Sequence, residues 1–329
     1  MLKPGRTVPQ ARNMAVKNCL HEFQRLADPA YARDVLGTDG PQLVVAFRES
    51  LEVLTRVGCQ IEAQFVRKLR DRLLLVDSLR DAAILTAHCE ATIAHLDTVP
   101  WLPEALRDRG SGASRGPVRL YFVRHAESTG NQERRLQGSR IHGALTPRGC
   151  LQSERTAIYL FDTFADLRAG AVSIVSSPVG RALETARPIG ERLGCTLSTE
   201  PDLAELDFGD WSGQFFVDLE RDRAYREWMQ DQWFHSPPAG ESLFEVRSRV
   251  CQAVASLLSC AIAGDTSPII VTHFFPLVAT FNTLMPGEII RPDNSSITCV
   301  EFAPGRWRQI LVNYAAHLGD DGPTPVAYV

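Results

Sequence analysis

Three short apolar runs, each near a segment with helical spacing, constrain the fold of this chain most. They lie at 118–123, 171–177 and 268–273, and helical patterns lie between them at 146–164, 179–193 and 241–262. Two further strands are predicted at 296–302 and 308–313, separated by the Pro304-Gly305 turn. Strands that alternate with helices form a parallel sheet with helices on its faces. The pattern therefore predicts an α/β fold, a mainly parallel three-layer α/β/α sandwich over residues 118–329.

The first hundred residues follow a different pattern, that of amphipathic helices. An apolar stripe at spacings of three, four or seven predicts one long helix. Its members are Phe47, Leu51, Leu54, Ile61, Phe65, Leu69, Leu73 and Val76. A second helix is predicted from about Ser78 to His95. We expect an α-helical domain over residues 1–106, joined by a glycine- and serine-rich linker at 107–117. The stripe would serve as a homodimer surface, a lid over the site, or a docking site for a partner.

Composition limits the environment and the partners of the chain. A net charge of −4 gives no reason to expect a nucleic acid or an anionic membrane as partner. No uninterrupted apolar run approaches the roughly 18 residues of a membrane span, and the N-terminus lacks the apolar stretch of a secretory signal. The eight cysteines are scattered without a CxxC pair, which favours reduced thiols over disulfides or zinc. We therefore expect a cytoplasmic protein.

Two of the predicted strands run directly into a histidine, His125 and His273. Ligand sites of open α/β sheets form outside the carboxyl ends of strands, so both imidazoles are candidates for a site. Arg124 precedes His125. Neutral imidazole is a nucleophile near pH 7, and a guanidinium offers a planar fork to phosphate oxygens. By itself an Arg-His pair fits a structural loop histidine as well as a phosphate site.

The residues around these histidines extend the pattern. RHAESTGN (124–131) resembles the RHG signature of the histidine phosphatase superfamily, which includes the phosphoglycerate mutases, with Ala126 where glycine is usual. RLQG (135–138), LTPRG (145–149), SSPVGRALETA (176–186), LAELDFGDWSG (203–213), PAGES (238–242) and VTHFFPLVA (271–279) resemble its later motifs in the same order. The resemblance covers about residues 118–318 and implies a phosphoglycerate mutase-like catalytic domain.

The resemblance also implies roles for individual residues. His125 would take the phosphoryl group, Arg124, Arg181 and His273 would bind it, and Glu205 would be the general acid. Asn131 would be a neutral donor to the phosphate. Gly138 begins a segment, up to Leu145, that is one residue longer than usual, so this loop would lie differently over the phosphate.

The implied activity is that of a metal-independent, acid-type phosphatase without a cofactor, acting on a small phosphorylated substrate. The arginines would supply the charge that magnesium supplies in other phosphoryl-transfer sites. Phe274 and Phe275 follow His273 where relatives carry small residues. Their rings would narrow the pocket, stack on an aromatic substrate, or simply pack.

Two other functions remain open at this point. A phosphoglycerate mutase would use the same histidine and return the phosphate to its own intermediate. The segment 214–238 is acidic as well as basic and lacks the paired arginines of the mutases before its prolines, which favours hydrolysis. A regulatory or binding protein without turnover is the third reading. The intact set of Arg124, His125, Arg181, Glu205 and His273 speaks against it.

Overall fold

The computed structural model describes residues 117–169, 171–230, 232–233, 235–284, 290–303 and 306–322. The predicted N-terminal helical domain, residues 107–116 of the predicted linker and the predicted turn at Pro304-Gly305 lie outside these residues.

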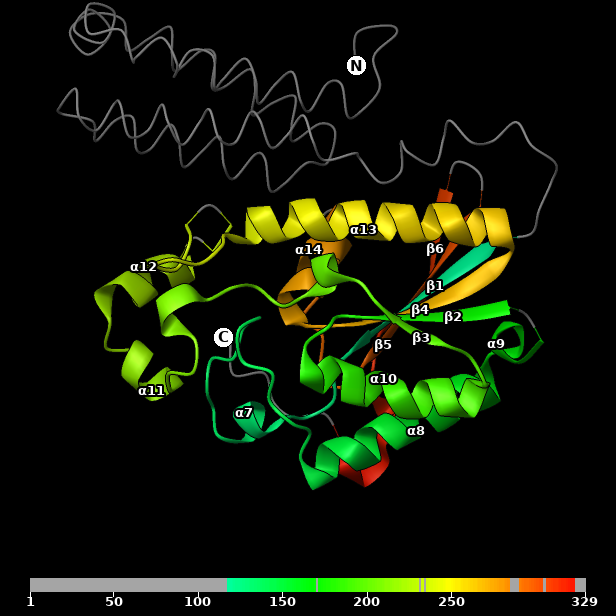
Figure 1. The fold of residues 1–329 in the computed structure, drawn as a ribbon, viewed down its shortest axis with the longest axis horizontal. Coiled ribbons are helices and arrows are strands. Elements are labelled where there is room, and N and C mark those ends of the chain that lie inside the picture. The colour runs from blue at the N-terminus through cyan, green and yellow to red at the C-terminus, as the bar shows by residue number, and fades with distance from the viewer. Residues whose placement is uncertain are drawn as a thin grey trace, which may run out of the picture. The chain divides into compact units, whose positions relative to one another are not determined.

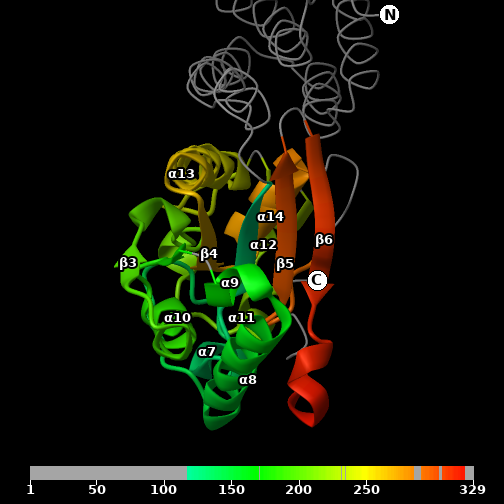
Figure 2. The same ribbon diagram turned by 90° about the vertical axis from the view of Figure 1, so that its right-hand side faces the viewer.

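A six-stranded sheet forms the centre of the described part (Figures 1 and 2). Its strands, in the order of the sheet, are β3 (Leu197–Thr199), β2 (Ala171–Ser176), β4 (Thr266–Thr272), β1 (Val118–Arg124), β5 (Ile297–Ala303) and β6 (Arg306–Tyr314). The four strands from β3 to β1 pair in parallel, whereas β5 pairs antiparallel with both β1 and β6. The sheet is thus mixed. Strands separated by only two residues can pair side by side only in the antiparallel sense.

Helices cover both faces of the sheet, as the alternating pattern predicts. On one side lie α8 (Pro147–Thr163) and α10 (Gly180–Leu193), and on the other lie α13 (Leu243–Gly264) and α14 (Phe274–Leu284) (Figure 1). Shorter elements are α7 (Thr129–Gln132), α9 (Ala165–Ala169), η2 (Pro201–Leu203), η3 (Gly209–Trp211), α11 (Phe216–Leu219), α12 (Arg223–Gln230) and η4 (Ala316–Asp321). Thr146 caps α8 by accepting a hydrogen bond from the Gly149 amide (3.0 Å), and Pro147 occupies the first turn.

Alternate residues of each strand point to opposite faces and so build two cores. Tyr121 and Val123 of β1 pack with Ile174 of β2 against α8 and α10. On the other face the ring of Phe122 meets that of Phe281 of α14 at 5.5 Å. These buried strand residues hold the carboxyl ends of β1, β2 and β4 side by side, where the candidate site lies.

α13 is long and apolar enough to cross a membrane by length and composition alone. Half of its most apolar stretch is buried, and it packs against α14 and β4. Its first residues are fixed by a capping box in which Ser242 and Glu245 bind each other's backbone amides. The helix therefore has the character of a core helix of this fold.

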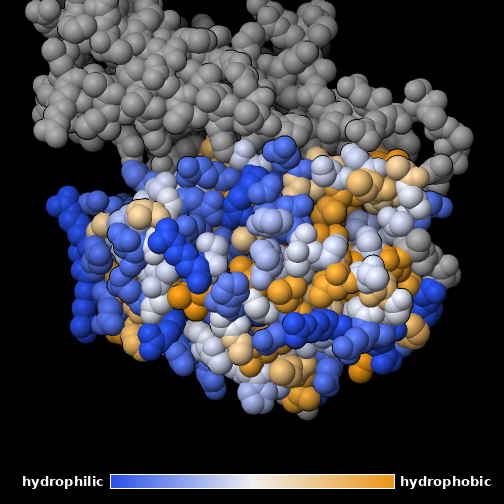
Figure 3. Space-filling model, in the orientation of Figure 1, coloured by the Kyte–Doolittle hydropathy of each residue, from blue (hydrophilic) through white to orange (hydrophobic). Residues whose placement is uncertain are grey.

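The surface seen in Figure 3 mixes hydrophilic and hydrophobic side chains. Among the described residues, the exposed large hydrophobic side chains come from several different elements. They are Ile141, Leu151, Ile158, Phe215, Val217 and Val312. Single exposed apolar residues of this kind are normal for a folded protein.

Candidate active site

The backbone on both sides of His125 is fixed by neighbouring strands. Its amide donates to the Thr272 carbonyl (2.8 Å), which ties the end of β1 to the end of β4. Its carbonyl accepts hydrogen bonds from the Asn294 side chain (2.9 Å) and the Ser295 amide (3.3 Å). The side chain is 2% exposed. The imidazole thus has a rigid base, as a nucleophile needs.

The hydrogen bonds of the His125 ring set its tautomer. Nδ1 lies 2.8 Å from the Ala126 carbonyl oxygen, which can only accept, so Nδ1 carries the hydrogen. Nε2 then has the lone pair, and it accepts a hydrogen bond from Arg181 Nε at 3.2 Å. Burial, together with the charges of Arg181 and Arg124, holds the pKa of His125 well below its usual value. The ring is therefore neutral at pH 7, with its nucleophilic atom beside a guanidinium.

Arg181 lies in the first turn of α10 and is held by the loop that follows α7. Its Nη1 donates to the Ile141 carbonyl (2.8 Å) and its Nη2 to the Gly138 carbonyl (3.0 Å). Gly138 has φ +62°, and a Cβ there would lie 2.8 Å from the Leu206 oxygen. Only glycine lets this loop approach the Leu206 backbone so closely. The predicted loop residue Gly138 thus orients the guanidinium with its carbonyl.

His273 stands at the end of β4, its ring 5.1 Å from that of His125 between centroids. Its Nε2 lies 2.8 Å from Ser177 Oγ, which also accepts a hydrogen bond from the Val179 amide. Its Nδ1 is buried and has no hydrogen-bond partner within the described part of the chain. Burial, followed by the charge of Arg181, lowers the pKa of His273 well below its usual value. A buried polar nitrogen of this kind suits a ligand.

Arg124 completes the cationic cluster and is 1% exposed. Its Nη1 donates to the Pro292 carbonyl (2.8 Å), and its guanidinium lies 5.3 Å from the Phe274 ring centroid. Phe274 and Phe275 are both buried, and Phe275 packs against the rings of Phe208 and Trp228. Of the three expectations for these rings, the structure supports packing. A contact of Phe274 with substrate stays a prediction.

Glu205 follows η2 and is 1% exposed. Its carboxylate accepts hydrogen bonds from the amides of Phe274 (3.2 Å), Phe275 (3.1 Å) and Leu206 (2.9 Å). The first two amides belong to the first turn of α14, whose N–H groups have no partner within the helix. Burial raises the pKa of Glu205, although Arg181 and the amides oppose the shift. A raised pKa suits a carboxyl group that donates a proton.

Asn131 and His142 fix two loops beside this cluster. Asn131 Oδ1 accepts from the Ser128 amide (3.1 Å) and lies 3.4 Å from Asn294 Nδ2, which leaves the Asn131 amide nitrogen to donate to a ligand. His142 accepts the Arg181 amide on its carbonyl and the Gly180 amide on Nδ1. It thereby anchors its loop to the start of α10.

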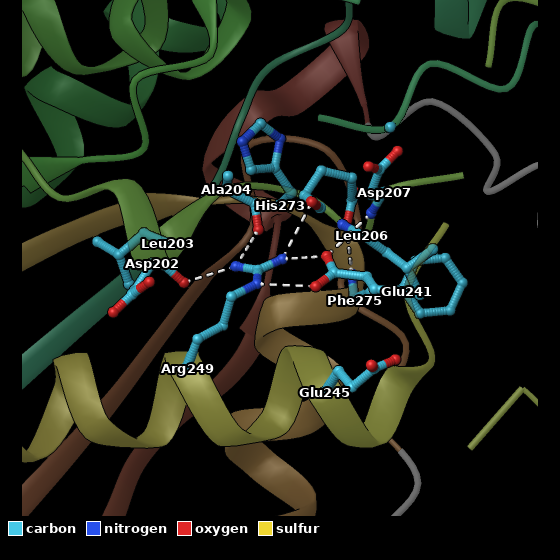
Figure 4. A network of polar contacts seen from close by, with 12 residues as sticks. Asp202, Leu203, Ala204, Leu206, Asp207, Glu241, Glu245, Arg249, His273 and Phe275 are labelled. Carbon is cyan, nitrogen blue, oxygen red and sulfur yellow. Dashed lines mark hydrogen bonds and ion pairs between the residues drawn. The ribbon is translucent and has the colours of Figure 1, made fainter. Parts of the chain in front are cut away.

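Four residues that sequence reasoning did not place in the site support it. Ser177 binds His273, and Asn294 binds the His125 carbonyl. Arg249 of α13 and Glu241 hold the segment that carries Glu205 (Figure 4). Ser177 and Glu241 lie inside two of the motifs noted above, and Arg249 follows Glu241 by about two helical turns. That spacing was the available signal for the pair.

The cluster as a whole is buried and places two guanidiniums near one carboxyl group. Arg124, Arg181 and the two imidazoles meet there, with Glu205 beside them. Within the described ranges, no group of three or more His, Cys, Asp or Glu residues could hold a metal ion. Guanidiniums in a buried site can stabilise the charge on transferring phosphoryl oxygens.

Comparisons with known proteins point to the same chemistry. The sequence profile described as the histidine phosphatase superfamily (branch 1) matches residues 120–315. A Mycobacterium tuberculosis protein named bifunctional protein Rv2228c is 31% identical over 253 residues, which are 74% of this chain and 66% of that protein. The chain thus spans about two thirds of the length of this relative. A Proteus mirabilis protein named probable phosphoglycerate mutase GpmB is 29% identical over 197 residues. The match covers 58% of this chain and 87% of the GpmB chain.

Solved structures match the same region. The mycobacterial glucosyl-3-phosphoglycerate phosphatase Rv2419c, solved with VO3, is 26% identical with a TM-score of 0.52. The match covers 60% of this chain and all of the phosphatase chain.

Proposed function

Because the chain belongs to the histidine phosphatase superfamily, an enzyme family of phosphatases and phosphotransferases, we propose that it hydrolyses a small phosphomonoester through a phosphohistidine on His125. The observation that carries this proposal is the state of the His125 ring. Its Nε2 lone pair is placed 3.2 Å from Arg181 Nε, while its Nδ1 is held by the Ala126 carbonyl. This is the geometry of an imidazole prepared to attack phosphorus beside a phosphate-binding guanidinium.

The first step forms a bond between His125 Nε2 and phosphorus and breaks the bond to the leaving oxygen. Glu205 donates its proton to that oxygen, which its raised pKa favours. Arg124, Arg181 and His273 Nδ1 bind the equatorial oxygens during transfer. In the second step the Glu205 carboxylate takes a proton from water, whose oxygen attacks phosphorus and releases His125 and inorganic phosphate.

We further propose that the reaction needs no metal. The two buried guanidiniums already supply positive charge at the position where magnesium acts in other phosphoryl-transfer enzymes. The substrate would be a small phosphorylated metabolite encountered in the cytoplasm. The phosphatase named for glucosyl-3-phosphoglycerate makes phosphorylated sugar acids a first class to screen.

Phosphoglycerate mutase activity is the second candidate, favoured by the similarity to GpmB. A mutase must retain a bisphosphate, which needs cations beyond the phosphate pocket. The loop after Gly138 does carry an arginine, Arg140. Its charge is neutralised by Asp207, whose Oδ1 lies 2.7 Å from Arg140 Nε. We therefore favour hydrolysis over phosphate return.

One experiment tests the covalent step and separates the two activities. The protein is mixed with p-nitrophenyl phosphate, quenched in alkali and measured by intact mass, since phosphohistidine survives alkali and is lost in acid. We expect an added phosphoryl group that is absent in His125→Ala. In parallel, 3-phosphoglycerate is followed for phosphate release and for isomerisation. A phosphoryl group on another residue would refute the mechanism, and isomerisation without phosphate release would identify a mutase.

A further inference from the structure

One arginine of α13, Arg249, binds the backbone of the segment that carries Glu205. Arg249 donates from Nη1 to the carbonyls of Asp202 (2.6 Å) and Ala204 (2.8 Å), and from Nη2 to the carbonyl of Glu205 itself (3.1 Å). Figure 4 shows the side chain leaving α13 and reaching these backbone oxygens. Three carbonyls of one short segment thus converge on a single guanidinium, whose planar fork suits several acceptors at once.

Glu241 binds both Arg249 and the backbone that follows Glu205. Its Oε1 accepts from Arg249 Nη2 (2.6 Å) and from the Asp207 amide (2.9 Å), and its Oε2 accepts from Arg249 Nε (3.2 Å). The pair is bidentate, and both side chains are about one-fifth exposed, 20% and 21%. Bidentate charged pairs are stronger and more directional than neutral hydrogen bonds. Arg249 and Glu241 therefore bind the chain on both sides of Glu205, at residues 202–205 and at Asp207.

The side chain of Glu205 is held independently, by the amides of Phe274 and Phe275 at the start of α14. The carboxyl group thus has two supports, α14 for its oxygens and Arg249 for its backbone. Neither support touches His125 in the contacts described. A loss of the second support would move the carboxyl group relative to the phosphorus while leaving the nucleophile in place.

We propose that Arg249, together with Glu241, is a positioning residue for proton transfer by Glu205. The inference rests on the proposed role of Glu205 as the general acid. Arg249 acts through the backbone of residues 202–205 and does not touch the reacting atoms. In the transfer of the phosphoryl group to His125, its contribution should therefore appear only where the leaving group needs a proton.

The test compares two substrates of different leaving group, p-nitrophenyl phosphate and β-glycerol phosphate. The nitrophenolate leaves without much help, whereas the alkoxide needs protonation. General acid help is worth on the order of 10²–10⁴-fold. The comparison uses kcat/KM, which reports on formation of the phosphohistidine, because its later hydrolysis is common to both substrates and also uses Glu205. We expect Glu205→Gln to lose that much kcat/KM on β-glycerol phosphate and little on p-nitrophenyl phosphate. Arg249→Gln should lose roughly tenfold or more in kcat/KM on β-glycerol phosphate and under about threefold on p-nitrophenyl phosphate.

Controls separate positioning from stability. Arg119→Gln removes a comparable half-buried arginine that binds Asp166 and Glu301 at the opposite end of β1. We expect it to leave the ratio of the two activities unchanged. Arg249→Lys keeps the charge but loses the fork, so it should show a weaker form of the same change and serves if the glutamine variant fails to fold.

The double variant decides the outcome. If Arg249 acts through Glu205, Arg249→Gln combined with Glu205→Gln should be no slower on β-glycerol phosphate than Glu205→Gln alone. Equal losses of Arg249→Gln on both substrates, or losses that multiply in the double variant, would overturn the proposal. If Glu205→Gln itself shows no preference between leaving groups, the acid assignment fails, and the positioning role falls with it.

Discussion

Two glycines with similar backbone angles offer a measurement of how tightly the Glu205 loop is packed. Gly209 has φ +53° and Gly194 has φ +64°, so alanine is strained at both. A Cβ at Gly209 would lie 2.0 Å from the Pro238 oxygen, whereas a Cβ at Gly194 would meet nothing within 4 Å. Both substitutions to alanine therefore carry the cost of a positive φ, and they differ in the collision that the new Cβ meets.

The magnitudes follow from this comparison. The left-handed backbone costs alanine about 1 kcal/mol, which should be the whole effect of Gly194→Ala. Gly209→Ala must also separate the loop from the turn at 237–241. That separation breaks the hydrogen bonds from Asp210 to Pro238 and from Glu241 to Asp207, both 2.9 Å. At about 0.5–1.5 kcal/mol for each bond, the total loss becomes about 2–4 kcal/mol.

Urea unfolding followed by tryptophan fluorescence measures the difference. Trp211 and Trp228 are buried near this loop and report on its part of the fold. We expect the free energy of unfolding to fall by about 1–3 kcal/mol more for Gly209→Ala than for Gly194→Ala. Equal losses in the two variants would refute the close backbone packing of loop and turn.

The remaining predictions concern the pocket. His125→Ala should abolish phosphate release and leave the circular dichroism spectrum unchanged, and a lost spectrum would mean a structural role. Vanadate should inhibit and EDTA should not; a strict need for added divalent metal would refute the metal-independent mechanism. Activity on alkyl phosphates should fall as pH rises through the raised pKa of Glu205, because the protonated acid is then lost. The free energy of unfolding should change in the other direction and fall as pH falls, because the pKa values of His125 and His273 are lowered in the folded protein. As pH falls below about 6.5, the unfolded imidazoles take up protons and the buried ones do not, so stability drops by up to about 1.4 kcal/mol per pH unit and histidine. His273→Asn should flatten this slope in urea unfolding, and an unchanged slope would contradict the neutral buried ring.

Local patterns in the sequence were sufficient for the central elements of the fold. The start of α8 at Thr146-Pro147 was predicted because a side-chain cap and a first-turn proline are local signals. β1, β2 and β4, with the histidines that follow β1 and β4, were also predicted from local signals, namely short apolar runs. The short edge strand β3 was not, because three residues show no periodicity.

The antiparallel direction of β5 and the helix α14 depended on more than local pattern. Phe274–Leu284 is apolar almost throughout, so it lacks the polar face that marks an amphipathic helix. The two histidines and Arg124 were predicted from their place at the strand ends, whereas Arg181, Glu205, Asn131 and Gly138 were named by resemblance. Their mutual distances, and the backbone contacts of Arg249, depend on tertiary packing that no spacing along the chain expresses.

The hydrogen bond from the His125 amide to the Thr272 carbonyl has a consequence for how this scaffold can vary. It joins neighbouring strands, and parallel strands lie about 4.8 Å apart. The 5.1 Å between the two imidazoles is close to that spacing. The sheet itself thus sets the distance between the two imidazoles of the proposed phosphate site. Side-chain changes in the loops at 139–145 and 206–240 should therefore accommodate new substrates, because the main chain beneath these loops fixes the spacing of the two imidazoles.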